Sequence, residues 1–171
     1  MGYNKNMNKS KQSIIHRLSH FILIGFILAQ IMVFFIHFNY GKIISLKIIG
    51  IIIWVISAIL GWLPIYIFKK KGGVTKGESF VKTSKLIDTG IYSIIRHPQY
   101  LAGILLSIAF MLFTQHWLVI LLGIPVVIIF YIGGVEGDRD GIKKFGQEYQ
   151  NYIKKVPRFN FILGILKKLK K

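Results

Sequence analysis

Four long apolar stretches constrain the fold of this chain more than any other feature of its sequence. They run from about Phe21 to Phe38, Ile43 to Phe68, Pro98 to Phe113 and Trp117 to Val135. A helix needs roughly 20 apolar residues to cross the hydrocarbon layer of a bilayer. Apolar residues make up 53% of the 171 residues, which is more than a soluble domain of this length needs for its core. We therefore expect an all-α integral membrane protein with about four transmembrane helices.

These spans predict one membrane domain in four consecutive parts. They are a transmembrane hairpin (residues 1–68), a cytoplasmic connection (69–97), a second transmembrane hairpin (98–135), and a cytoplasmic amphipathic helix with a basic tail (136–171). The first span is not expected to be a cleaved signal peptide, because its apolar run is long and no small-residue cleavage site follows it. Gln30 falls in the middle of this span, where we expect its amide to form a hydrogen bond to a neighbouring helix.

The basic residues are distributed very unequally between the two sides of this topology. All of the 23 lysines and arginines except Lys42 and Lys47 fall on the side of the two termini. The positive-inside rule then places both termini in the cytoplasm, with the protein in the cell (inner) membrane. The formal net charge of +17 is explained by attraction to anionic lipid headgroups, and no nucleic-acid partner is expected. The chain has no cysteine, so it has no disulfide or thiolate metal site.

Polar side chains gather where the third span begins. The stretch from Gly90 to Tyr100 reads GIYSIIRHPQY, which brings Arg, His, Gln and two Tyr to a membrane boundary. Ionisable groups are costly there, and they mark sites that bind something. Arg96 could instead reach the headgroups with its long side chain. Pro98 suits the first turn of a helix. We expect this stretch to line the mouth of the bundle.

A second polar block follows the fourth span. Acidic residues lie between Glu136 and Asp140, and an amphipathic helix is predicted after them. Its apolar residues recur at spacings of three and four and so share one face: Ile142, Phe145, Tyr149, Tyr152 and Val156. Two interpretations are open. The helix lies on the bilayer surface, or it covers the mouth of the bundle as a lid.

Together, the two blocks resemble the isoprenylcysteine carboxyl methyltransferase and phospholipid methyltransferase superfamily. The first block matches G-x-Y-x-x-x-R-H-P-x-Y, and the second matches F-G-x-E-Y-x-x-Y followed by V-P-R, so that the resemblance covers Lys85 to Phe159. It implies S-adenosylmethionine as methyl donor at the cytoplasmic mouth and a lipophilic acceptor that enters from the bilayer. The cofactor-binding positions that it implies are Ser84, Lys85, Leu86, Ile87, Tyr92, His97, Pro98, Gln99 and Tyr100.

The second block departs from the family pattern in its acids. The resemblance places the acidic pair at Gly137 and Asp138, so the first acid, which binds the cofactor, is missing. Glu136 and Asp138 are the candidates to replace it. We expect Glu136 to do so and Asp140 to tolerate substitution. Gly133 stands where isoprenylcysteine enzymes carry an arginine for the substrate carboxylate.

The sequence leaves the acceptor open. It could be an isoprenylcysteine-like carboxylate, another lipid or isoprenoid, or the amine of a phospholipid, and a non-catalytic lipid-binding protein of the same fold is a further alternative. A carboxylate acceptor needs no general base, so no catalytic residue is assigned. An amine or hydroxyl acceptor would need one, for which His97, Glu136 and Asp138 are candidates.

A haem protein is the competing hypothesis from another class. His20 and His97 lie at the predicted cytoplasmic ends of spans, and His37 and His116 lie at the opposite ends, so that two axial pairs are conceivable. Histidines at span ends also have a simpler interfacial explanation. We therefore expect no metal site.

Overall fold

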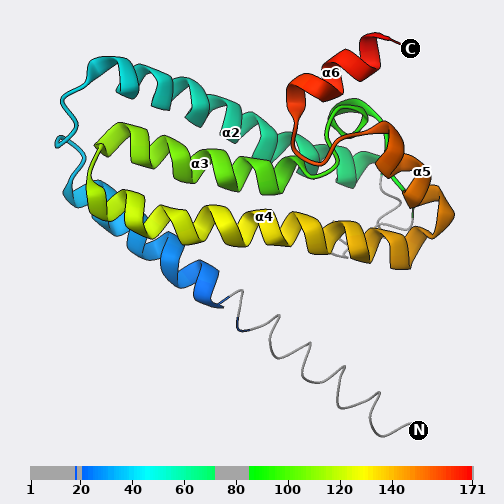
Figure 1. The fold of residues 1–171 in the computed structure, drawn as a ribbon, viewed down its shortest axis with the longest axis horizontal. Helices are drawn as coiled ribbons and strands as arrows, with labels where there is room; N and C mark the ends of the chain where they lie inside the picture. The colour runs from blue at the N-terminus through cyan, green and yellow to red at the C-terminus, as the bar shows by residue number, and fades with distance from the viewer. Residues whose placement is uncertain (1–17, 19–20, 72–84, 171) are drawn as a thin grey trace, which may run out of the picture.

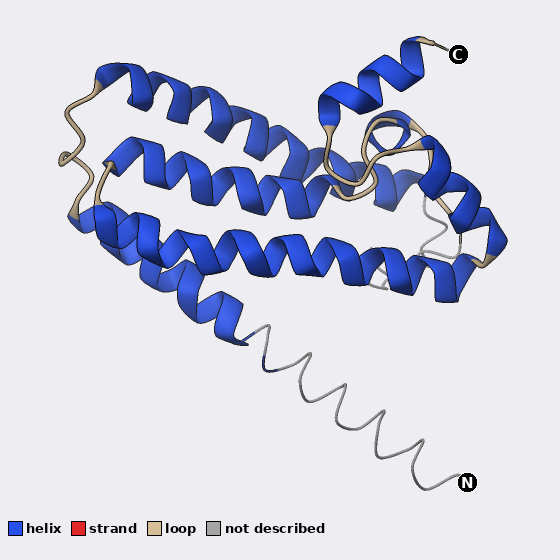
Figure 2. Cartoon of the chain, in the orientation of Figure 1, coloured by secondary structure: helices blue, strands red, loops and turns tan. Residues whose placement is uncertain are grey.

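The described structure is entirely helix and loop. The computed structural model describes residue 18, residues 21–71 and residues 85–170 (Figure 1). This part contains no β-strand, which confirms the all-α prediction (Figure 2). Its elements are a first helix, Phe21–Ile36, followed by α2 (Ile44–Lys71), the 3-10 turn η1 (Gly90–Ser93), α3 (Pro98–Thr114), α4 (Trp117–Phe145), α5 (Gln147–Lys155) and α6 (Phe161–Leu169).

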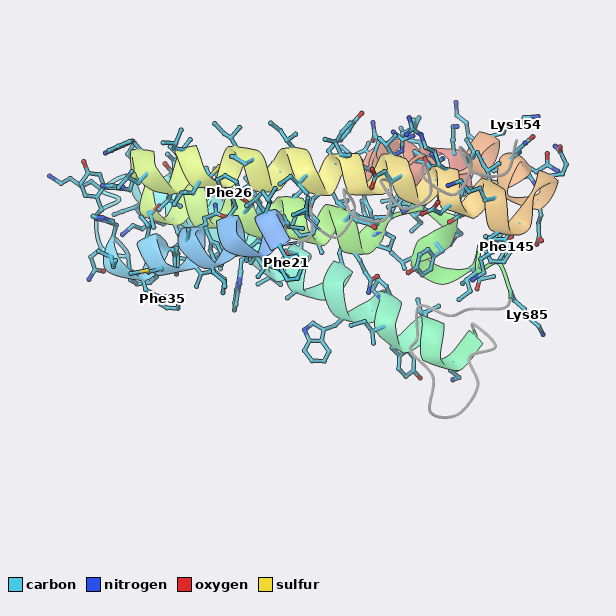
Figure 3. All side chains as sticks on the ribbon, turned by 90° about the horizontal axis from the view of Figure 1, so that it is seen from below. Phe21, Phe26, Phe35, Lys85, Phe145 and Lys154 are labelled. Carbon is cyan, nitrogen blue, oxygen red and sulfur yellow. The ribbon has the colours of Figure 1, made fainter. Side chains whose placement is uncertain are left out.

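The long helices run side by side in an antiparallel bundle. In Figure 1, α3 lies between α2 and α4, and α5 and α6 gather at the end where α3 begins and α4 finishes. We call this the α5 end and the opposite end the His116 end. Figure 3 shows Lys85 and Phe145 together at the α5 end, far from Phe35. The chain therefore brings both polar blocks of the sequence to one end of the bundle.

Two helices are long and apolar enough to cross a membrane, namely Ile44–Ile67 and Trp117–Phe145. The helices Phe21–Ile36 and Pro98–Thr114 are apolar but shorter, so four spans remain a prediction. Large apolar side chains cover the outside of the bundle, and Trp62, for example, is 77% exposed. An apolar surface of this extent marks contact with lipid or with another protein.

A buried polar network joins three helices near the middle of the bundle. Gln30 donates through Nε2 to the carbonyls of Ser107, at 3.2 Å, and of Val119, at 3.4 Å. The Ser107 hydroxyl lies 3.0 Å from Gln30 Oε1 and 3.3 Å from the Gly123 carbonyl. The expected interhelical hydrogen bond of Gln30 is thus confirmed. It fixes the first helix against α3 and α4, since an unsatisfied amide would be costly in this position.

The region after Val135 differs from the prediction of one amphipathic helix. Helix α4 continues without a break to Phe145, so the acidic residues belong to the same helix as the apolar span. Phe145 is its last residue, and Gly146 follows as the C-cap. The φ of Gly146 is +57°, which lies in the left-handed region that glycine adopts without strain. Helix α5 folds back after this turn. Ile142 and Phe145 still pack with Tyr149, Tyr152 and Val156, as the periodicity predicted, but from two helices.

Two histidines stack at the His116 end of the bundle. The rings of His37 and His116 lie face to face, with centroids 3.8 Å apart and an interplanar angle of 10°. His116 Nδ1 accepts a hydrogen bond from the Leu118 amide at 3.3 Å. These contacts give both rings a structural role. In the described residues there is no group of three or more His, Cys, Asp or Glu suited to a metal ion, and His20 lies outside those residues.

Candidate functional site

The turn before α3 is held in place by the chain that follows α5. The Arg96 amide donates to the Pro157 carbonyl at 3.0 Å, and the His97 amide donates to the Arg158 carbonyl at 3.4 Å. Pro98 begins α3, as predicted, and this suits a residue without an N–H group. The two motif blocks, about 60 residues apart in sequence, are therefore paired through their backbones.

Asp138 is the centre of the site. Its side chain is 6% exposed and accepts hydrogen bonds from two guanidinium groups, a histidine and a phenol. Arg96 donates through Nε at 3.0 Å and Nη2 at 2.9 Å, and Arg158 donates through Nε at 2.7 Å. His97 Nε2 lies 2.8 Å and the Tyr149 hydroxyl 3.1 Å from Oδ1. A carboxylate offers about four lone-pair positions, so this one is fully used by the protein.

Arg96 has a second set of partners at the end of α5. Its Nη1 donates to the carbonyl of Ile153 at 3.1 Å and to the carbonyl of Val156. The residue is only 8% exposed. The guanidinium is therefore occupied by protein partners, and its observed role is to join the turn before α3 to α4 and α5.

Three buried tyrosines complete this framework. The Tyr152 hydroxyl donates to the Tyr92 carbonyl at 2.6 Å, and Tyr149 donates to Asp138. Burial raises the pKa of Tyr92, Tyr149 and Tyr152 above the ordinary tyrosine value of 10.0. The phenols consequently stay neutral and remain hydrogen-bond donors at physiological pH.

Glycines on α4 make room for the rings of the site. A Cβ placed on Gly137 would lie 2.7 Å from Cε1 of His97, which is too close for any side chain to be added without a shift. Gly133 and Gly141 lie one turn before and one turn after Gly137 on the same face. The ring of Tyr100 packs against Gly133, and the ring of Tyr149 packs against Gly141, so a Cβ at either glycine would also be too close. Gly137 is therefore a packing requirement of His97.

Two cavities adjoin His97. The first, which we call the inner cavity, has a volume of about 330 Å³. It is lined by Lys85, Leu86, Ile87, Tyr92, Arg96, His97, Gly137, Asp140, Gly141, Lys144, Phe145, Tyr149 and Tyr152. The second, which we call the aromatic cavity, has a volume of about 410 Å³. It is lined by Tyr92, Arg96, His97, Pro98, Gln99, Tyr100, Phe130 and Gly137.

Most of the residues singled out from the sequence line one of these cavities. Lys85, Leu86 and Ile87 line the inner cavity only, whereas Pro98, Gln99 and Tyr100 line the aromatic cavity only. Tyr92 and His97 line both. Ser84 lies outside the described residues. The predicted set is thus divided between two neighbouring spaces.

The acids are arranged differently from what the sequence suggested. Glu136 is exposed and lines neither cavity, and Asp138 is buried and already bound by the protein. Asp140 lines the inner cavity and forms an exposed ion pair with Lys143 at 2.9 Å. Sequence reasoning missed Asp140, Gly141 and Lys144 as lining residues. Their spacing of three, four and seven from Gly137 was the signal that could have placed them on its face.

The comparison with known protein families gives a match over the centre of the chain. A family model described as phospholipid methyltransferase matches residues 45–136, which is more than half of the chain. The matched region contains α2 except its first residue, the turn before α3, α3 and most of α4. No curated protein and no solved structure gives a significant match.

Proposed function

The chain belongs to the phospholipid methyltransferase family, and on this premise we propose that it transfers a methyl group from S-adenosylmethionine to a lipophilic acceptor in the membrane. The observation that carries the proposal is the meeting of two cavities at His97 and Gly137. A methyl transfer needs a donor and an acceptor in contact, with water excluded. Two spaces that share one wall provide such an arrangement.

The inner cavity is proposed to hold the donor. S-adenosylmethionine supplies a methyl group that is already activated by its sulfonium. Tyr92 and Phe145 offer ring faces for the adenine or the cation. The Asp140 carboxylate is suited to the ribose hydroxyls, and Lys85 and Lys144 are suited to the donor carboxylate. The volume and the mixture of acid, base and aromatic side chains fit this group. The location of Asp140 makes it a stronger candidate than Glu136 for the acid of the donor site.

The aromatic cavity is proposed to hold the acceptor group. Pro98, Tyr100 and Phe130 line it from α3 and α4, which are both apolar helices. An acceptor with a long apolar chain can reach such a cavity from the bilayer. The candidates remain an isoprenylcysteine-like carboxylate, an isoprenoid or other lipid, and a phospholipid amine.

One observation favours an acceptor that must lose a proton, such as an amine. Because the ionised Asp138 can only accept hydrogen bonds, Nε2 of a neutral His97 carries the ring proton, and Nδ1 remains an acceptor. Nδ1 lies on the side of Gly137, where the two cavities meet. His97 is therefore suited to take the acceptor's proton at Nδ1, with Asp138 stabilising the imidazolium. Gly133, in place of an arginine, leaves a carboxylate acceptor without that partner.

The test combines donor binding with product analysis. Purified protein is titrated with S-adenosylmethionine and its demethylated product by calorimetry. His97→Ala and Asp140→Ala, which both alter the inner cavity, should each weaken binding by roughly 1–3 kcal/mol, the scale of a lost buried polar partner. Tyr40→Ala is the control, because Tyr40 is exposed at the His116 end. Unchanged donor affinity in both site variants would contradict the assignment.

The acceptor is identified with radiolabelled donor and membranes that contain either phosphatidylethanolamine or an S-farnesylcysteine analogue. Label in the phospholipid supports amine methylation, and label in the analogue supports carboxylate methylation. Donor binding without transfer to any lipid would favour the non-catalytic alternative. We further propose that both termini face the cytoplasm and that the basic residues there contact anionic lipids.

A further inference from the structure

A third cavity lies at the α5 end, separate from His97. Its volume is about 570 Å³. It is enclosed by α5, α6 and the segment before α3, and it shares only Leu86 and Tyr152 with the inner cavity. Its polar lining residues are Asp88, Ser93, Glu148, Asn151, Lys155, Lys167 and Lys168, besides the shared Tyr152. We call it the lysine cavity.

The basic end of this cavity is built from two helices. Lys155 closes the last turn of α5, and Lys167 and Lys168 come from the last turn of α6. Lys167 Nζ lies 3.4 Å from the carbonyl of Lys154, which holds it near α5. Within the described residues, none of the three cavity lysines forms an ion pair.

In the described residues, the two acids of the cavity, Asp88 and Glu148, form no ion pair with these lysines. Glu148 is two helical turns before Lys155 on α5, a separation of about 10 Å along the helix axis. Asp88 lies near Tyr152, on whose phenol its charge acts. Lys155, Lys167 and Lys168 thus line one cavity, and no carboxylate of the described residues is paired with them, so their ammonium groups can donate to a phosphate group.

On helix α6 the side that carries Lys167 and Lys168 faces the lysine cavity, where both side chains are exposed, and the apolar side points outward. Gly164, Lys167 and Lys168 share one face by their spacing of three and four. Gly164 is buried against the carbonyl of Ile94, and a Cβ at this position would clash with that oxygen. The opposite face carries Ile162 and Leu169, which are 72% and 78% exposed.

This orientation is unfavourable in water but favourable at a lipid surface. A helix surrounded by water would turn its lysines outward and bury its leucines. An interfacial helix instead inserts its apolar face among the acyl chains. Figure 1 shows α6 at the α5 end, extending away from the bundle at an angle to α3. With α6 inserted in this way, the lysine cavity would lie at the depth of the lipid headgroups.

We infer that the lysine cavity binds the phosphate of an anionic phospholipid, whose acyl chains pack along the apolar face of α6. Lys155, Lys167 and Lys168 donate to the phosphate oxygens. This lipid is distinct from the methyl acceptor, because the cavity does not contain His97 or Gly137. The inference can be tested without the methyl donor, so it stands or falls separately from methyl transfer.

The experiment measures binding of dioleoyl phosphatidylglycerol to the purified full-length protein by native mass spectrometry. The cavity variant carries Lys155→Gln, Lys167→Gln and Lys168→Gln. The control carries Lys143→Gln, Lys154→Gln and Lys170→Gln, which remove the same charge from α4, from α5 and from the end of α6 but do not line the cavity. The affinity should fall on the order of 100-fold in the cavity variant, since each lysine near an anionic headgroup contributes about a fivefold factor. Equal losses in both variants would overturn the proposal.

Two further measurements define the ligand and the site. Dioleoylglycerol, which lacks phosphate, should not displace the phospholipid, and inorganic phosphate at the same concentration should not displace it either. Displacement by the first would overturn the role of phosphate, and displacement by the second would overturn the lipid as its source. Gly164→Ala keeps all charges but pushes α6 away from Ile94, and it should also weaken binding by tenfold or more. Unchanged binding in Gly164→Ala would show that the phospholipid is attracted to the lysines without a defined site, and it would refute the lysine cavity as the binding site.

Discussion

The guanidinium of Arg96 and the carboxylate of Asp138 form a two-point ion pair, with N–O distances of 3.0 and 2.9 Å, between two segments 42 residues apart. Both side chains are 6% exposed. Such a pair adds little net stability when intact, because both charges lose their hydration. Removing one partner is costly, because the other charge stays buried. The pair therefore specifies how the turn before α3 fits against α4.

Replacing Asp138 by Asn should destabilise the protein strongly. Arg96 and Arg158 would lose their carboxylate, and the expected cost is about 3–5 kcal/mol in the free energy of unfolding. Thermal unfolding of the purified protein in detergent measures it. Asp140→Asn is the matched control, with a change within about 0.5 kcal/mol, because Asp140 forms an exposed pair. Equal midpoints for the two variants would show that Asp138 is not the centre of the site.

Placing an acid at position 137, where the family resemblance led us to expect one, should reduce donor affinity rather than improve it, and Gly137→Glu is the substitution that tests this. The new side chain would displace the His97 ring, which lines the proposed donor cavity. Overpacking of this kind typically costs about 1–3 kcal/mol in the free energy of folding. Calorimetric titration with S-adenosylmethionine measures the change. Gly25→Ala is the control, since no heavy atom lies within 4 Å of the place that its Cβ would occupy. Tighter donor binding by Gly137→Glu would support the interpretation of Gly137 as a lost acid.

Stability should fall at high pH because of the buried tyrosines. Burial raises the pKa of Tyr149 and Tyr152 in the folded state, so the unfolded chain loses these protons at lower pH than the folded protein. This contribution is fully present below the ordinary value of 10.0 and is lost as pH rises above it. Thermal midpoints measured from about pH 8 to about pH 11 test the prediction. The double variant Tyr149→Phe and Tyr152→Phe should show a shallower decline, and an identical decline would assign the effect to other groups.

The predicted orientation can be read with single cysteines, because the natural chain has none. Tyr40→Cys and Glu148→Cys place exposed thiols at opposite ends of the bundle. In intact cells, an impermeant thiol reagent should label the first and not the second, if the α5 end faces the cytoplasm. Permeabilised cells provide the control in which both are labelled. Labelling of Glu148→Cys alone in intact cells would reverse the topology.

Local sequence patterns were sufficient to predict those features of the structure that depend on a residue and its near neighbours in the chain. Apolar runs of the right length predicted the helices, Pro98 predicted the start of α3, and Gln30 in an apolar run predicted a hydrogen bond across helices. The period of three and four also predicted which residues after Phe145 pack together. It did not show the break at Gly146, because an amphipathic period continues in register across the turn.

The sequence by itself determined that the chain is helical and apolar, and that its polar residues meet at one end of the bundle. Only the tertiary structure decided what each polar residue does there. From the sequence, Asp138 is a candidate ligand for the donor. In the structure its carboxylate already accepts hydrogen bonds from four side chains, those of Arg96, Arg158, His97 and Tyr149. The physical reason is that the partners of a buried charge come from segments far apart in sequence. Their convergence depends on helix packing, which no local pattern encodes.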